Sequence, residues 1–167
     1  MASQQLGRLT LPRAVAGHPA LELCNTRAGW GGQTPREYLE TYEHLLVWAG
    51  ALDLVPEESV RRLRQQAVRN PDEAEAVLSG ARTLRSDLYA ALTDPDPARD
   101  VLDGLGVAIR AAGADICVDH ARAGGLRLEH DPGALTLPVH AFADAARDLI
   151  QAGLAGDVGR CPGTGCG

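Results

Sequence analysis

One apolar pattern dominates the sequence and restricts the folds open to it. After Asn70, apolar side chains return at the period of an α-helix through about five turns. They are Ala74, Val77, Leu78, Ala81, Leu84, Leu88 and Leu92. The pattern predicts one long amphipathic helix, capped by Asn70, with a buried apolar face. The chain is therefore expected to be built around packed helices.

Other segments have the same period, and proline marks where each begins. Thr34-Pro35-Arg36-Glu37 has the form of a capping box with proline at the first helical position, which predicts a helix from this point. Pro56-Glu57-Glu58 predicts a second helix, before the long one, and Asp96-Pro97 predicts a further helix after it. The helical period returns beyond Pro138 in a last helix.

Between the last two helices the period changes from that of a helix to that of a strand. Residues 116–121 and 126–129 alternate apolar and polar side chains, and Asp131-Pro132-Gly133 has the composition of a turn. Leu135 and Leu137 then predict a third short strand. The fold class expected is α+β: a predominantly helical single domain of about five helices with a small three-stranded antiparallel meander.

Size and charge narrow the function. The chain has 167 residues, which suits one domain, and its net charge of −6 argues against a complete nucleic-acid-binding surface. All 16 basic residues are arginines, so Schiff-base chemistry and a lysine-bearing phosphate loop are excluded. No apolar run is long enough to span a membrane and no export signal begins the chain. We therefore expect a cytoplasmic protein with no membrane partner.

The four cysteines fall into two groups. Cys24 and Cys117 lie among apolar residues and are predicted to be buried. Cys161 and Cys166 flank four residues that include proline and two glycines, a loop able to place both thiolates on one zinc ion. Structural zinc requires four ligands, and no second pair is evident upstream. The alternative interpretation is a flexible tail with two unused cysteines.

A ligand pocket is a second hypothesis. Asn25 and Thr26 offer hydrogen-bonding groups beside the flat ring of Trp30, although Asn25 and Thr26 could equally bond their own backbone. Arg82 and Arg85 lie three residues apart on the long helix, where they could clamp an acid group or pair with nearby carboxylates.

Histidines complete the candidates. His140 opens the last helix and joins the hypothetical pocket as a further lining residue. His120 and His130 could span a metal site across the hairpin, but cross-strand pairing with carboxylates explains them more simply. The sequence indicates no nucleophile that would pair with any of the histidines, so no catalytic residue is predicted.

Four motifs carry a family resemblance. They are Leu21 to Thr26, Tyr42 to Ala49, Ala81 to Arg85, and Arg160 to Gly167. In this order they resemble proteins that join an ABATE domain to a carboxyl-terminal CGNR zinc finger, a family of bacterial stress-induced transcription regulators. The resemblance implies an amino-terminal extension in residues 1–17, a regulatory domain in residues 18–157, and the incomplete start of a zinc finger in residues 158–167.

The resemblance also implies a function. Cys161 and Cys166 would be two of four zinc ligands in the full-length protein, with zinc not expected to be held by this chain alone. DNA would be contacted through the missing part of the finger. The domain would be a sensory or dimerising, non-enzymatic part of the regulator, coupled to the finger through residues 139–155. A small-molecule effector and a homodimer are therefore expected.

Two alternatives from other classes stay open. One is a small-molecule-modifying enzyme that uses a pocket near Asn25, Trp30, Arg82 and His140. The other is an interaction module in which apolar helix faces form a homodimer and no ligand exists.

Overall fold

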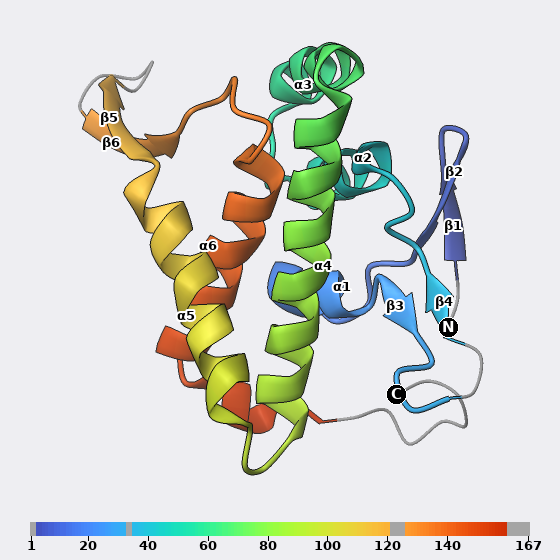
Figure 1. The fold of residues 1–167 in the computed structure, drawn as a ribbon, viewed down its shortest axis with the longest axis vertical. Helices are drawn as coiled ribbons and strands as arrows, with labels where there is room; N and C mark the ends of the chain where they lie inside the picture. The colour runs from blue at the N-terminus through green and yellow to red at the C-terminus, as the bar shows by residue number, and fades with distance from the viewer. Residues whose placement is uncertain (1–2, 33–34, 121–125, 160–167) are drawn as a thin grey trace.

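A computed structural model describes residues 3–32, 35–120 and 126–159. Within them lie six α-helices, a short 3-10 helix and three separate two-stranded antiparallel sheets. The helices α4, α5 and α6 run side by side, and α3 crosses one end of them (Figure 1). The prediction of a mainly helical α+β single domain is confirmed.

Periodicity located the long helices correctly. They are α3 (Glu57–Arg69), α4 (Pro71–Thr93) and α5 (Arg99–Ala114). The apolar face of α4 is buried, with Leu78 and Leu88 fully inaccessible to solvent. Asn70 stands at the N-cap of α4, but its side chain makes no capping bond there and donates instead to the Gln66 carbonyl at 3.3 Å.

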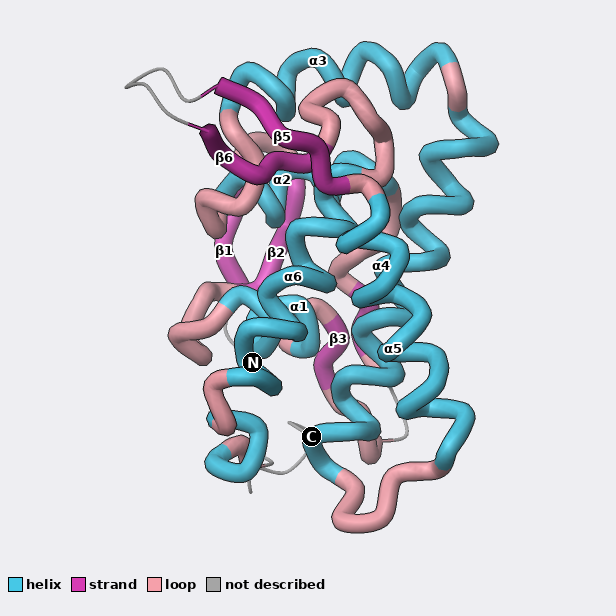
Figure 2. The backbone as a smooth tube through the Cα atoms, turned by 90° about the vertical axis from the view of Figure 1, so that its left-hand side faces the viewer, coloured by secondary structure: helices cyan, strands magenta, loops and turns pink. Residues whose placement is uncertain are grey.

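The predicted third strand is wrong. Leu135 lies in a turn and Leu137 is the first residue of α6 (Leu137–Gln151), with proline in its first turn. Both leucines are buried, so their alternation reflects entry into the helix rather than a strand. What remains is a hairpin of β5 (Ile116–His120) and β6 (Leu126–His130), which Figure 2 shows apart from the other strands.

The helix predicted from Thr34 also begins too early. α2 spans Tyr42–Ala51, after an extended N-cap residue, Thr41. Arg36–Glu37 forms β4, which pairs with β3 (Arg27–Ala28). The Glu37 carboxylate accepts bonds from the Leu39 amide and from Arg85 of α4, so long-range contacts override the capping pattern, and Thr34 itself lies outside the described residues.

Short elements at the amino terminus were not predicted as such. β1 (Ser3–Leu6) and β2 (Leu9–Pro12) form a hairpin whose turn contains Gly7 at φ +64°. α1 (Pro19–Cys24) follows, with the His18 side chain accepting a bond from the Ala20 amide. The residues predicted as an extension therefore contain ordered structure.

The core lies between the helices, with α6 at its centre. α6 packs against α1, α2, α4 and α5 and is followed by the 3-10 helix Leu154–Asp157. Trp48 and Phe142 are fully buried, and Cys24 is buried, as predicted. Cys117 is exposed, contrary to prediction, because it lies on a two-stranded hairpin whose residues 117–119 are all exposed rather than in the helical core. No helix among the described residues is long and apolar enough to cross a bilayer.

Candidate functional site

Arg85 is the centre of a buried polar network. Its side chain is 2% exposed and holds the Glu37 carboxylate through two bonds of 2.6 Å, Nη1 to Oε1 and Nη2 to Oε2. Nη1 also donates to Thr26 Oγ1 at 3.0 Å, and the Thr26 hydroxyl donates to the Leu23 carbonyl at 2.6 Å. Arg85 therefore ties α4 to the end of α1 and to β4.

The electrostatics of this pair follow from the contacts. Burial of Glu37 by itself would raise the pKa of its carboxyl group. The hydrogen bonds and positive charge of Arg85 outweigh burial and hold the pKa of Glu37 below its ordinary value. Glu37 is therefore ionised at neutral pH and serves as the counter-charge of Arg85.

Trp30 lies beside the same network. Its ring stacks on Tyr89 of α4, with centroids 4.0 Å apart and planes 4° from parallel. The Arg27 guanidinium carbon lies 4.7 Å from the Trp30 ring centroid, and Trp30 Nε1 donates to the Cys24 carbonyl at 3.2 Å. The Trp30 ring, which we predicted to contact a ligand, is thus in contact with other side chains of the protein.

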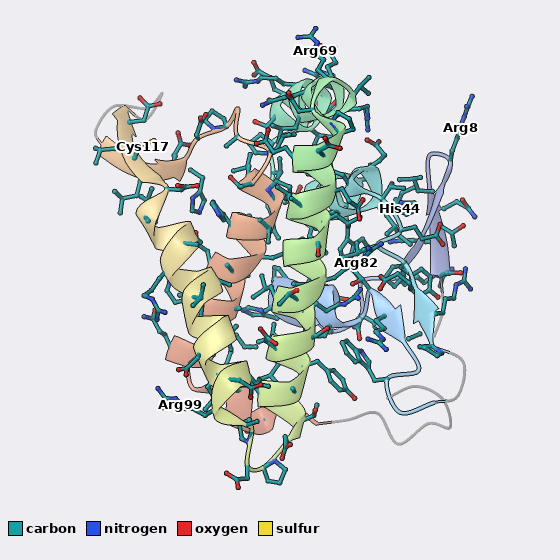
Figure 3. All side chains as sticks on the ribbon, in the orientation of Figure 1. Arg8, His44, Arg69, Arg82, Arg99 and Cys117 are labelled. Carbon is teal, nitrogen blue, oxygen red and sulfur yellow. The ribbon has the colours of Figure 1, made fainter. Side chains whose placement is uncertain are left out.

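Arg82 and Asn25 also bind protein groups. Arg82 donates from Nε and Nη2 to the Leu39 carbonyl at 3.0 and 2.7 Å, and from Nη2 to the Glu40 carbonyl at 3.2 Å. Figure 3 places Arg82 on the side of α4 that faces this segment. Asn25, the C-cap of α1, donates to Glu22 Oε2 at 3.2 Å.

The structure thus brings Asn25, Thr26, Trp30 and Arg85 into one corner, with Arg82 one turn away along α4. Thr26 and Arg85 make the backbone and ion-pair contacts that were the alternative to ligand binding, and Asn25, Trp30 and Arg82 contact other groups of the chain. Glu37, which sequence reasoning missed as the partner of Arg85, completes the corner. A role of these residues in binding a ligand stays a prediction.

His140 does not join this corner. It lies on α6 near the hairpin, with Nδ1 3.1 Å from Asp115 Oδ2 and its ring centroid 5.5 Å from that of His130. Burial lowers the pKa of His140 more than the nearby carboxylates raise it. His130 bonds through Nε2 to Asp144 Oδ2 at 2.6 Å, so its carboxylate partner is on α6 and not across the strands.

Two adjoining hollows flank the His130–Asp144 pair. The larger, about 650 Å³, lies between the start of α3, the hairpin and the start of α6, and we call it the α3 groove. The smaller, about 340 Å³, runs along α6 toward α1. The two hollows share three of their lining residues, Leu54, His130 and Ala141.

Sequence reasoning did not locate the α3 groove. Its walls come from segments far apart in the chain, and its lining residues form no local motif. The only signal was His130, which was considered for metal binding. In the described part of the chain, no three His, Cys, Asp or Glu side chains are placed to hold a metal ion. Cys161 and Cys166 lie outside that part.

Comparison with known families gives the decisive observation. The model of the ABATE family, described as "putative stress-induced transcription regulator", matches residues 17–157. The chain belongs to the ABATE family. No match was found among curated proteins or among solved structures. The ABATE resemblance drawn from the sequence motifs is thereby confirmed, and the zinc-finger start in residues 158–167 stays a prediction.

Proposed function

We propose that this ABATE domain is the sensory part of a cytoplasmic, DNA-binding transcription regulator, with the α3 groove as its effector site. The observation that carries the proposal is the position of α6. Its first half lines both hollows, and its sides pack against α1, α2, α4 and α5. In the chain it is followed by the 3-10 helix and then by the segment that contains Cys161. A displacement of α6 would therefore be transmitted both to the core and to the residues that follow α6 in the chain.

An effector acts in this proposal only through unequal affinity for two arrangements of α6. A ligand that binds both arrangements equally shifts nothing, however tightly it binds. The lining of the α3 groove supports this proposal, because its walls come from α3, the hairpin and α6. A ligand that contacts all three walls binds more tightly to the arrangement of α6 in which the distance between the walls matches the size of the ligand.

DNA binding is proposed to reside in a zinc finger begun by Cys161 and Cys166. Two thiolates suit zinc chemically but are half of a tetrahedral set. Among the described residues no three potential ligands gather into a metal site of their own, and the proposal takes the other two zinc ligands from the rest of the finger in the full-length protein. Zinc would supply the folding free energy of that finger.

The enzyme alternative requires a nucleophile held against a base. His130 is oriented by Asp144 as a base would be, but its Nδ1 is buried and has no hydrogen-bond partner in the described residues. The family description also points to regulation rather than catalysis.

Dimerisation is proposed to use the β5–β6 hairpin. Val118 and Leu128 stand opposite each other and are 63% and 71% exposed. Strand edges and exposed apolar pairs of this kind suit a symmetric contact with a second copy. Light scattering should show a dimer that Leu128→Arg converts to monomers, and a monomeric wild-type protein would refute the contact.

The regulator proposal is tested with full-length protein and a DNA fragment that this protein selects from a genomic library. Cys161→Ser should abolish both zinc content and retention of the fragment. Ala141→Trp, which fills the junction of the two hollows, should change affinity for the fragment, measured by fluorescence anisotropy. Ala111→Trp on the exposed side of α5 is the matched control and should change nothing. Zinc and DNA binding that survive Cys161→Ser would reject the finger, and unchanged affinity in Ala141→Trp would reject coupling through α6.

A further inference from the structure

Basic residues are unevenly distributed along the chain. The first 36 residues contain four of the 16 arginines and one of the 22 acidic residues, Glu22, which is 2% exposed. Three of these arginines, Arg8, Arg13 and Arg36, are exposed, and we call the surface that they form the basic face. We infer that the basic face contacts backbone phosphates of the DNA that the regulator binds. The inference rests on the proposed function and adds a DNA-contacting surface outside the zinc finger.

The basic face lies on one side of the domain. Arg8 is in the turn between β1 and β2, Arg13 directly follows β2, and Arg36 is in β4. Figure 1 shows β1 to β4 together on the side of the molecule opposite α5 and the β5–β6 hairpin. In Figure 3, Arg8 points away from the body of the domain on this side, whereas Arg99 and Cys117 lie on the other. A dimer formed through the β5–β6 hairpin would therefore leave the basic face uncovered.

The arginines of the basic face are free to bind a new partner. Within residues 3–32, 35–120 and 126–159, none of the three forms an ion pair. An unpaired guanidinium at the surface can bind a phosphate without first breaking an ion pair. Arginines elsewhere in the domain do pair with carboxylates, among them Arg61, Arg64, Arg82, Arg85, Arg99 and Arg147.

Arg36 is also held in an orientation that suits a phosphate. Its guanidinium carbon lies 4.6 Å from the ring centroid of Tyr38, which is 3% exposed. A guanidinium stacked on a ring keeps its N–H groups at its rim, so it can donate to a phosphate while it stays stacked.

Acidic groups near the basic face do not cancel its charge. Glu37, the next residue in β4, is held by Arg85. Glu40, which follows β4, and Asp53, which shares a hollow with the end of β1, are exposed and form no ion pair with any described residue. Against these two carboxylates are the three arginines of the basic face, and half-buried Arg27 of β3 adds a fourth positive charge. This side of the domain is therefore net positive.

The rest of the chain directs DNA toward this side. Residues 37–167 contain 12 arginines and 21 acidic residues, so most of their surface repels a polyanion. Duplex DNA carries one phosphate charge per about 1.7 Å of its axis, so arginines spread over a surface can each reach a phosphate. DNA held by the finger would therefore meet attraction at the basic face and repulsion elsewhere on the domain.

The test measures the affinity of the full-length protein for the selected DNA fragment by fluorescence anisotropy at a series of salt concentrations. The triple variant Arg8→Gln, Arg13→Gln, Arg36→Gln should bind the fragment at least about tenfold more weakly. Each lost phosphate contact removes about 0.9 from the slope of log affinity against log salt concentration, so this slope should become shallower by about 2.7.

The matched control is the triple variant Arg69→Gln, Arg99→Gln, Arg110→Gln. It removes the same charge from exposed arginines of α3 and α5, and its slope should equal that of the wild-type protein. The inference is overturned if the two triple variants have the same slope, because net charge rather than the basic face would then decide affinity. If circular dichroism shows that the first triple variant is unfolded, Arg8→Gln alone must make the slope shallower by about 0.9.

The remaining outcomes separate this inference from the proposed function. DNA retention that is lost in Cys161→Ser, with an unchanged slope in the first triple variant, would overturn the basic face and leave the finger standing. Retention that survives Cys161→Ser but requires the three arginines would reject the finger and support the basic face. A wild-type protein that selects no DNA would overturn both. If light scattering shows that the first triple variant loses a dimer and its DNA affinity is unchanged, the face binds a second copy and the inference is wrong.

Discussion

Arg85 and Glu37 form an ion pair whose two side chains differ in burial. We therefore expect variants that lack one partner or the other to lose unequal amounts of stability. The side chains of Arg85 and Glu37 are 2% and 34% exposed. Glu37→Ala leaves a buried guanidinium without its counter-charge, which costs about 3 kcal/mol, the lower end for broken buried pairs because Glu37 is partly solvated. Arg85→Met leaves a carboxylate that water can reach and fills much of the same volume, so we expect a loss of about 1 to 2 kcal/mol.

The double variant is the sharpest part of this prediction. Once Arg85 is methionine, Glu37 has no buried charge to neutralise. Adding Arg85→Met to Glu37→Ala should therefore raise stability by roughly 1 kcal/mol and give a coupling energy of about 2 to 3 kcal/mol. Urea unfolding at neutral pH, followed by far-ultraviolet circular dichroism, measures all four proteins.

An exposed ion pair provides the control for this cycle. Arg64 and Glu43 form a 2.7 Å contact between α3 and α2, with side chains 48% and 34% exposed. The same cycle on this pair should give a coupling of no more than about 1 kcal/mol. If Arg85→Met proves the most damaging change, or if the two Arg85–Glu37 substitutions simply add, the assignment of Arg85 as a buried charge held by Glu37 is wrong.

Further predictions concern pH, thiol reactivity and packing. In the folded protein the pKa of His140 lies below its ordinary value of 6.5, so the unfolded chain binds this proton first as pH falls. The free energy of unfolding should therefore decrease as pH drops below 6.5. His140→Gln should flatten this dependence on pH, measured by urea unfolding at stepped pH. A thiol reagent should label exposed Cys117 in the folded protein, whereas burial raises the pKa of Cys24 to about 12, so peptide mass spectrometry should find Cys24 unlabelled until urea is added. Leu78→Ala in the core should cost about 2 to 5 kcal/mol, and Leu128→Ala on the hairpin no more than about 0.5 kcal/mol; equal losses would contradict the described packing.

The long helices were predictable because their signal is local and repeated. In α4, each turn adds another apolar residue in phase, so one misleading position cannot hide the pattern. The strands β1 to β4 have four residues or fewer and offer no such repetition. Arg36–Glu37 shows the limit: its capping pattern was genuine, but the contact of Glu37 with Arg85 favoured an extended conformation.

The candidate sites, too, could be predicted only in part from the sequence. Thr26 and Arg85 were singled out from the sequence, and the structure places them 3.0 Å apart, but their partner Glu37 was hidden inside an apparent helix start. The α3 groove could not be found, since Ser59 and His130 have no relation along the chain that indicates a shared wall.

By itself, then, the order of residues determined the helical period, the acidic charge and the ABATE motifs, because each is written in neighbouring positions. The tertiary structure decided which charges are buried, which strands pair and where a hollow remains. Those outcomes depend on which distant surfaces exclude water from one another, and that competition is settled only when all the helices pack at once.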